Sequence, residues 1–135
     1  MKVIHTDKAP KALGPYSQAI QTNGIIYLSG QIGIDPATGK AGTTIEEQTQ
    51  QIMQNIDAIL TEAGTDVHKV VKTTCFLANM SDFEAFNKIY GQYFVGKPAR
   101  SCVAVKELPA GMLAEVEVVA LAYGHENFSL GDYGV

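Results

Sequence analysis

The sequence predicts an α+β fold, a single domain in which two helices cover one face of a six-stranded mixed sheet. Three observations lead to this prediction. The 135 residues are 46% hydrophobic and 18% charged, which is typical of one globular domain with a substantial core. Six segments carry strand signals and two carry helical periodicity, in the order strand, strand, strand, helix, strand, helix, strand, strand. No linker, internal repeat or low-complexity segment divides the chain.

Three short strands are expected first. Residues 3–5 form one candidate, which Pro10 and its neighbours separate from the next. Residues 19–21 and 25–29 are predicted to pair as a hairpin closed by Asn23-Gly24, because Asn-Gly is the strongest short-range hairpin signal.

Two positions in this first part of the chain allow more than one interpretation. Tyr16 follows a Gly14-Pro15 turn and either packs against the protein, the commoner outcome, or projects its phenol into a cleft. Gly30 at the end of the hairpin either marks a bulge or lets a ligand approach the backbone N–H groups closely.

The first helix has clear boundaries. Thr44 and Glu47 fit a capping box at its start, and Gly64 is placed to end it. Apolar residues recur at helical spacing and form one core-facing stripe: Ile45, Ile52, Met53, Ile56, Ile59, Leu60 and Ala63.

The second helix follows a largely apolar strand at 70–78, which we expect inside the sheet. A second capping box is predicted at Ser81 and Glu84, and the helix stops before Gly96. Within this helix Asn87 faces either a cleft or, by default, solvent.

The last two strands, at 97–105 and 113–119, carry the residues with most chemical interest. Alternation puts Arg100 and Cys102 on one face of the first, and we expect them with Glu115 on the sheet face that lacks helices. Arg100 is the only arginine of the chain, and its guanidinium requires an anion. That anion is either a carboxylate of this protein, as in a structural Arg–Glu pair between strands, or a ligand carboxylate. The uncovered face predicts oligomerisation through it.

Composition and motifs exclude several classes of function. The net charge is −4 without a basic cluster, which argues against nucleic acid as a partner. No apolar run approaches the roughly 20 residues that span a membrane. Clustered ligands for a metal are absent from the sequence, so no metal site is predicted. Two cysteines without a disulfide pattern favour a reduced, cytoplasmic protein.

Several short motifs follow one another along the chain: Ala9-Pro10, Gly14-Pro15-Tyr16-Ser17-Gln18, Ser29-Gly30-Gln31-Ile32, Pro98-Ala99-Arg100-Ser101-Cys102-Val103, Leu108-Pro109 and Glu115-Val116-Glu117. In these motifs and their order, the chain from about Val3 to Tyr123 resembles the RidA (YjgF) family of reactive-intermediate deaminases. This resemblance implies a domain at 1–123 followed by a tail at 124–135. It also implies a chorismate-mutase-like fold and a homotrimer with its sites between subunits.

The implied activity is hydrolysis of 2-imino and enamine acids, such as 2-iminobutanoate and 2-iminopropanoate, to 2-oxo acids and ammonia. Pyridoxal-phosphate-dependent threonine and serine dehydratases release such imines. The family needs neither a metal nor an organic cofactor, so none is expected. A regulatory or ligand-sensing protein that binds small 2-oxo or amino acids without turnover is the alternative. A ribonuclease is disfavoured by the acidic charge balance and by the lack of paired histidines.

Matched position by position, the resemblance implies that Arg100 grips the substrate carboxylate and Glu115 activates water. Tyr16, Gly30 and Cys102 would line the pocket, and Asn87 matches a pocket position less closely.

The chain departs from the family at the connection before Pro98, which is shorter than in many relatives and lacks their frequent aromatic residue. This departure is expected to change access to the pocket and the size of substrate accepted.

A simple hairpin would place the Arg100 strand beside the Glu115 strand. The family fold instead implies that the Glu115 strand lies between the strands at 25–29 and 70–78, with the Arg100 strand at the far edge. Because neighbouring strands lie about 4.8 Å apart, Arg100 and Glu115 are then too distant to share a small ligand within one chain. A composite site is therefore expected, with Gly30 and Glu115 from one chain and Arg100 and Cys102 from its neighbour.

Overall fold

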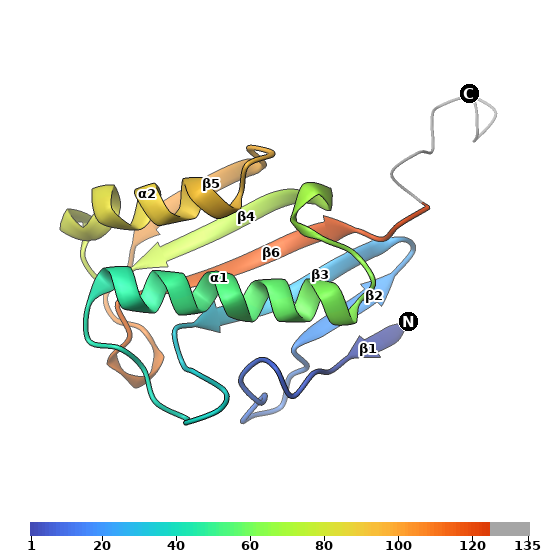
Figure 1. Ribbon diagram of the computed structural model, residues 1–135, viewed down its shortest axis with the longest axis horizontal. Coiled ribbons are helices and arrows are strands. Elements are labelled where there is room, and N and C mark those ends of the chain that lie inside the picture. Colours follow the sequence, from blue (N-terminus) through green and yellow to red (C-terminus); the bar gives the residue numbers. More distant parts are fainter. Residues whose placement is uncertain (125–135) are drawn as a thin grey trace.

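A computed structural model describes residues 1–124 as two helices lying on one face of a six-stranded sheet (Figure 1). The predicted fold class is confirmed. Of the predicted tail at 124–135, residues 125–135 lie outside the described part of the chain. The strands are β1 (Lys2–Ile4), β2 (Ala19–Thr22), β3 (Ile25–Ile32), β4 (Val70–Leu77), β5 (Ala99–Ala104) and β6 (Ala114–Leu121), and the helices are α1 (Ile45–Glu62) and α2 (Phe83–Tyr93).

The order of strands across the sheet is β1-β2-β3-β6-β4-β5. All neighbouring pairs are antiparallel except β4 and β5, which are parallel and joined through α2. The order implied by the family resemblance is confirmed, because β6 lies between β3 and β4 and β5 forms the far edge. A hairpin of β5 with β6 is wrong, since the whole of β4 separates them.

The predicted hairpin of β2 and β3 forms around two residues with positive φ. Asn23 has a φ of 51° and Gly24 a φ of 78°, the left-handed pair that a type I′ turn requires. The strands on either side pair from Ala19 with Leu28 to Thr22 with Ile25. This turn therefore sets the register that carries β3 toward the centre of the sheet.

Helix α1 begins as predicted. Thr44 accepts a hydrogen bond from the Glu47 amide, and the Glu47 carboxylate accepts from the Thr44 amide, which completes the capping box. The Thr44 hydroxyl also donates to the Glu47 carboxylate, and this bond, followed by the one from the Thr44 amide, lowers the pKa of Glu47. The first six residues of the predicted apolar stripe are buried, and Gly64 follows the helix with a φ of 78°.

Helix α2 does not begin with the predicted capping box at Ser81. A single 3-10 turn, η2 (Met80–Asp82), leads into the helix, and Asp82 is already in the helical conformation without a side-chain cap. The polar-residue pattern marked the right region, but the 3-10 turn supplies the entry that a cap would otherwise provide. The helix ends at Tyr93, before Gly96 as predicted.

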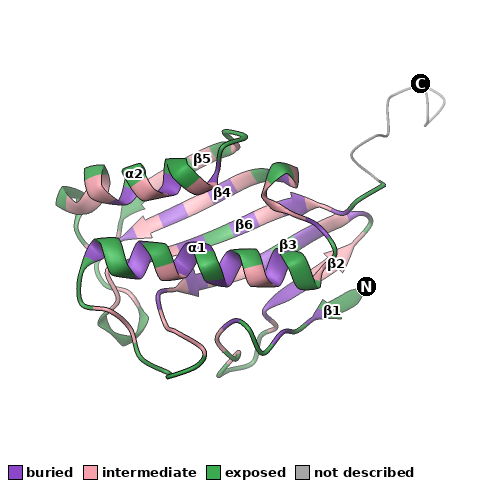
Figure 2. Ribbon diagram, viewed as in Figure 1, coloured by how far each residue is buried: buried purple, intermediate pink, exposed green. Residues whose placement is uncertain are grey.

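The core lies between the helices and the sheet. Figure 2 shows buried residues recurring along α1 and the inner strands, among them Ile26, Ile52, Ile56, Leu77 and Val116. Within residues 1–124, no helix lies over the other face of the sheet (Figure 1). There, Val3, Tyr27 and Val103 stay 61%, 46% and 44% exposed. Neither α1 nor α2, nor any other helix within residues 1–124, is both long and apolar enough to cross a bilayer.

Candidate functional site

Arg100 and Cys102 lie on the helix-covered face of β5, which corrects the prediction that they share the open face with Glu115. Cys102 pairs in register with Cys75, whose side chain is fully buried beneath the helices. The guanidinium carbon of Arg100 lies 4.6 Å from the centre of the Tyr90 ring on α2. Alternation within a strand shows which residues share a face, but it does not show which face a helix will cover. The charge is tolerated there because β5 is an edge strand and Arg100 stays partly exposed.

Helix α2 holds the Arg100 guanidinium from two sides. Nη1 of Arg100 donates a hydrogen bond of 2.6 Å to Oδ1 of Asn87, and the Phe83 ring centre lies 5.5 Å from the guanidinium carbon. Cation–π contacts of this kind contribute about 0.5–2 kcal/mol each, depending on their exposure to water. No carboxylate within residues 1–124 of the same chain pairs with Arg100, so the structural Arg–Glu pair between two strands of one chain is absent.

The Tyr90 ring is itself held in place by Thr73 of β4 and by Phe94. Its hydroxyl and that of Thr73, a fully buried residue of β4, lie 2.7 Å apart in a hydrogen bond. The Phe94 ring packs against it with centroids 4.5 Å apart. Burial raises the pKa of Tyr90, so the phenol remains neutral at physiological pH.

The sequence reasoning missed Tyr90, Phe83 and Thr73. The available signal was spacing, because Phe83, Asn87 and Tyr90 recur every three or four residues on one side of α2. Aromatic residues at such positions are more often simple core than part of a site.

A recess of about 430 Å³ opens beside this cluster, between α2 and the start of β5. Its lining includes Asn87, Tyr90, Phe94, Lys97, Pro98 and Arg100. Asn87 therefore faces a recess rather than solvent alone, and it does so while bonded to Arg100.

Glu115 lies on the open face of the sheet, together with Gly30. Its neighbours in register are Phe76 of β4 and Ile32 of β3. A β-carbon on Gly30 would lie 2.8 Å from the carboxylate carbon of Glu115 and closer still to one of its oxygens. The register of β3 against β6 shifts between Leu28 and Gln31, an irregularity that fits the bulge, one of the two alternatives for Gly30. Gly30 thus leaves room for the carboxylate of its own chain.

Burial raises the pKa of Glu115, and the neighbouring charge of Glu117 raises it further. Both effects favour the protonated form of this carboxyl group relative to that of an exposed glutamate.

The environment of Cys102 suits a residue that lines a pocket rather than a nucleophile. Burial raises the pKa of its thiol, an effect that the Arg100 charge partly opposes. The neighbouring Cys75 has its pKa raised to about 12 by burial. Both cysteines are free thiols, and neither environment favours the thiolate that nucleophilic chemistry requires.

Tyr16 lies apart from the other predicted residues. It is 54% exposed and lines a different recess of about 320 Å³, between the N-terminal loop and the segment after β3. The loop before it is anchored by Gln18, whose amide donates to the carbonyl oxygens of Thr6 and Pro10. Tyr16 is therefore held at the rim of a recess, with its phenol largely free of this chain.

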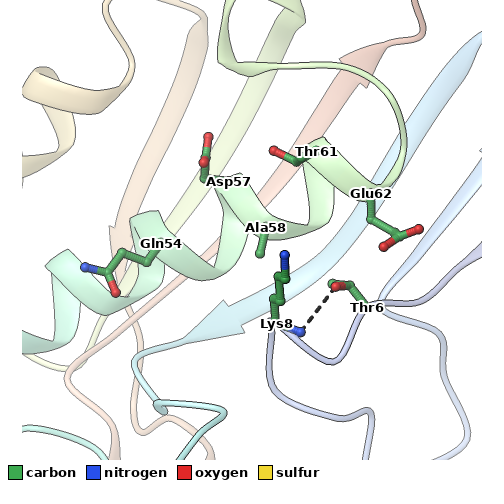
Figure 3. A pocket seen from close by; sticks show the side chains of 7 residues that line it. All are labelled: Thr6, Lys8, Gln54, Asp57, Ala58, Thr61 and Glu62. Atoms are coloured by element: carbon green, nitrogen blue, oxygen red, sulfur yellow. Dashed lines mark hydrogen bonds between the residues drawn. The ribbon is translucent and has the colours of Figure 1, made fainter.

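Another recess, of about 470 Å³, contains none of the predicted residues. It lies between the N-terminal loop and α1, and Figure 3 shows the Lys8 side chain pointing toward the helix that carries Asp57 and Glu62. Nor do the described residues include three or more clustered His, Cys, Asp or Glu side chains that could hold a metal ion.

Five of the six predicted residues thus fall into two candidate half-sites of one chain, and Tyr16 lies apart from both. Arg100 bonds to Asn87 and shares the helix-covered face with Cys102, whereas Gly30 and Glu115 meet on the opposite face of the sheet. Arg100 pairs with Thr73 on β4, and Glu115 pairs with Phe76 on that same strand. The two residues are consequently about 10 Å apart across the sheet and a further 10 Å along it. One chain cannot bring both to a small ligand.

Comparison with known proteins identifies the family. The family model described as endoribonuclease L-PSP matches residues 6–122. A Lactococcus lactis protein whose name proposes a regulator, AldR, is 52% identical over 122 residues, which cover 89% of this chain and 97% of that protein. The mouse 2-iminobutanoate/2-iminopropanoate deaminase is 49% identical over 123 residues, which cover 89% of this chain and 90% of that protein.

A solved structure agrees with these relatives. Escherichia coli TdcF with bound serine matches with a TM-score of 0.87 and 35% identity, over 90% of this chain and 98% of that one. Together with the motifs around Arg100 and Glu115, these matches show that the chain belongs to the RidA (YjgF) family.

Proposed function

We propose that this protein hydrolyses 2-imino acids and their enamine tautomers, including 2-iminobutanoate and 2-iminopropanoate, to 2-oxo acids and ammonia. The observation that carries the proposal is the preset guanidinium of Arg100. It is oriented by Asn87 and Tyr90 and has no carboxylate partner within residues 1–124. The 49% identity to the mouse deaminase supports the same reaction class.

In the proposed reaction, water adds to the C=N carbon and ammonia leaves. Arg100 binds the substrate carboxylate and fixes the position of the neighbouring imine carbon. Glu115 takes a proton from the attacking water and delivers one to the departing nitrogen, a role for which its raised pKa is suited. General acid–base help of this kind contributes about 10²–10⁴-fold, enough for an imine that already hydrolyses unaided. Cys102 shapes the wall and forms no covalent intermediate.

The proposed site is composite and sits between subunits of a homotrimer. Its support is the separation of Arg100 from Glu115 on opposite faces and the partly exposed apolar residues of the open sheet face. Packing the open face of one copy against the β5 edge of another, where Arg100 is partly exposed, would bring one chain's Glu115 toward another chain's Arg100. We propose the cytoplasm as the location, where dehydratases release such imines.

A coupled assay tests the function. An amino-acid oxidase generates the imine, and formation of 2-oxo acid is followed with and without this protein. Acceleration that disappears in Arg100→Ala supports the deaminase. An unaccelerated reaction, despite a correctly assembled protein, contradicts it.

The second candidate is a regulatory protein that binds small 2-oxo or amino acids at the same residues without turnover. The name of the Lactococcus lactis relative favours it, and the serine reported in TdcF fits either function. Calorimetric binding of 2-oxobutanoate, combined with absence of turnover in the coupled assay, would select this candidate.

A further inference from the structure

The recess beside Arg100 carries two positive charges and no negative one. Arg100 and Lys97 both line it, whereas none of the aspartates or glutamates of residues 1–124 does. Neither cation forms an ion pair with a described carboxylate. Its remaining lining is aromatic, aliphatic or amide, so nothing in the recess neutralises these charges.

The backbone conformation of the connection fixes the position of Lys97. It lies in the short connection between α2 and β5, where its N–H donates to the carbonyl oxygen of Phe94 at 3.1 Å. Its φ of 53° is unusual for a residue other than glycine. Pro98 follows directly and restricts the connection further. This geometry places Lys97 on the same recess as Arg100, only three residues away.

Some donors of the Arg100 guanidinium are used within the chain, and the others remain available to a ligand. Nη1 is occupied by Asn87, and the ring of Tyr90 lies against the guanidinium. The donors that remain can grip one carboxylate in a bidentate manner. A second anionic group on the same ligand would need a different cation. The Lys97 ammonium, carried on a flexible side chain, is a suitable partner.

We propose that this recess binds a second acidic group of the substrate, so that imino acids with a carboxylate in the side chain are substrates of this protein. The proposal rests on the proposed function, since Arg100 holds the first carboxylate. A dicarboxylic imine such as 2-iminosuccinate would set its reacting end at Arg100 and its side-chain carboxylate at Lys97. The recess volume of about 430 Å³ falls within the range of small-molecule sites.

The test compares two substrates and two variants. Alanine and aspartate oxidation supply 2-iminopropanoate and 2-iminosuccinate, and kcat/KM is measured for each as 2-oxo acid formation. In Lys97→Gln we expect kcat/KM for 2-iminosuccinate to fall about 10-fold, as for the loss of one charge-assisted hydrogen bond. The value for 2-iminopropanoate should change less than about 2-fold, because that substrate has no second acid.

Lys88→Gln is the matched control. Lys88 is an exposed lysine of α2 that does not line the recess, so this variant makes the same change in net charge nearby. It should leave both substrates unaffected. Equal effects of Lys97→Gln on both substrates, or an effect equalled by Lys88→Gln, would overturn the proposal.

A binding measurement separates this inference from the proposed function. If neither imine is turned over, the deaminase proposal fails. Calorimetry with 2-oxoglutarate and 2-oxobutanoate then tests, independently of turnover, whether the recess binds a second acidic group. Selective weakening of 2-oxoglutarate binding by Lys97→Gln supports a site for a second acid, and equal affinities in wild type and variant refute it.

Discussion

Arg100 shows how a single side chain is prepared for a ligand before the ligand arrives. Its guanidinium is oriented by an amide and two aromatic rings, all from α2. None of these groups neutralises its charge. The arrangement lowers the entropic cost of binding, because the long Arg100 side chain is already held in one rotamer before the ligand arrives.

Arg100→Lys should lower kcat/KM for 2-iminopropanoate at least about 10-fold, although the charge is kept. A lysine ammonium cannot provide the bidentate bonds or stack on Tyr90, and a charge-assisted hydrogen bond contributes about 1.5–3 kcal/mol. The coupled assay measures the loss, and circular dichroism checks the fold. Near-normal turnover in the folded variant would remove Arg100 from the role of carboxylate clamp.

Gly30→Ala should reduce activity while leaving the fold in place. The new methyl group occupies the space of the Glu115 carboxylate, which is the mobile end of a side chain and can be displaced without moving the backbone. We expect kcat to fall severely and the melting temperature to change little. Gly64→Ala, far from the site at a φ of 78°, is a useful comparison that should lower stability and spare kcat. Full activity in Gly30→Ala would show that catalysis does not depend on the position of the Glu115 carboxylate.

Glu115→Gln should raise the melting temperature at neutral pH. Burial raises the pKa of Glu115 in the folded protein, so the folded state binds this proton more tightly than the unfolded chain. The resulting stabilisation is complete below the unfolded value of about 4.3 and is lost as the pH rises through the folded pKa. The advantage of the variant should therefore shrink as the pH falls toward 4. A wild type that is more stable than the variant at pH 7 would contradict this reasoning.

At the scale of elements, α2 acts as the support of the half-site under it. One side of the helix contributes Phe86 to the core, while Phe83, Asn87 and Tyr90 reach Arg100. The bond from Tyr90 to Thr73 ties this support to β4, the strand beside the one that carries Arg100.

Tyr90→Leu should raise KM about 2–30-fold for any substrate that Arg100 binds, in line with the energy of a cation–π contact. Tyr90→Phe keeps the ring and should affect KM less, although the buried hydroxyl of Thr73 then loses its partner and stability falls. Phe86→Leu, a core change in the same helix, controls for instability and should leave KM alone. Indistinguishable KM values for Tyr90→Leu and Phe86→Leu would rule out the positioning role.

The sequence predicted most elements because their signals are local. Asn23-Gly24 specifies its turn through two positive φ values, and Thr44 with Glu47 specifies a helix start through mutual hydrogen bonds. The capping box predicted at Ser81 and Glu84 does not form, since a 3-10 turn at Met80–Asp82 leads into α2 instead.

The site was predictable only in part, because faces and distances are properties of the assembled sheet. The motifs identified Arg100 and Glu115, but the alternation of β5 could not reveal that α2 lies over Arg100. Contributions from Tyr90 and Thr73 come from separate elements that meet only in three dimensions. Their types suggested core, and both are indeed largely buried.

At the scale of the whole molecule, the two half-sites predict complementation between subunits. Arg100→Ala and Glu115→Ala should each be inactive, and mixing them after subunit exchange should restore part of the activity. A mixed trimer that contains both variants can then have a site with an intact Arg100 and an intact Glu115. Exchange is verified by mass spectrometry of differently tagged chains. Mixed trimers that remain inactive would show that one chain supplies both residues.

The strand order also bears on how the protein is made. Of the six described strands β6 is synthesised last, yet it is the neighbour that both β3 and β4 require. At about 5–20 residues per second, the stretch from the end of β4 at Leu77 to the end of β6 at Leu121 takes roughly 2–9 s to synthesise. During that interval the facing edges of β3 and β4 lack the strand that joins them, and their backbone N–H and C=O groups are open to wrong partners. Strand order alone therefore delays completion of the sheet until translation has passed Leu121.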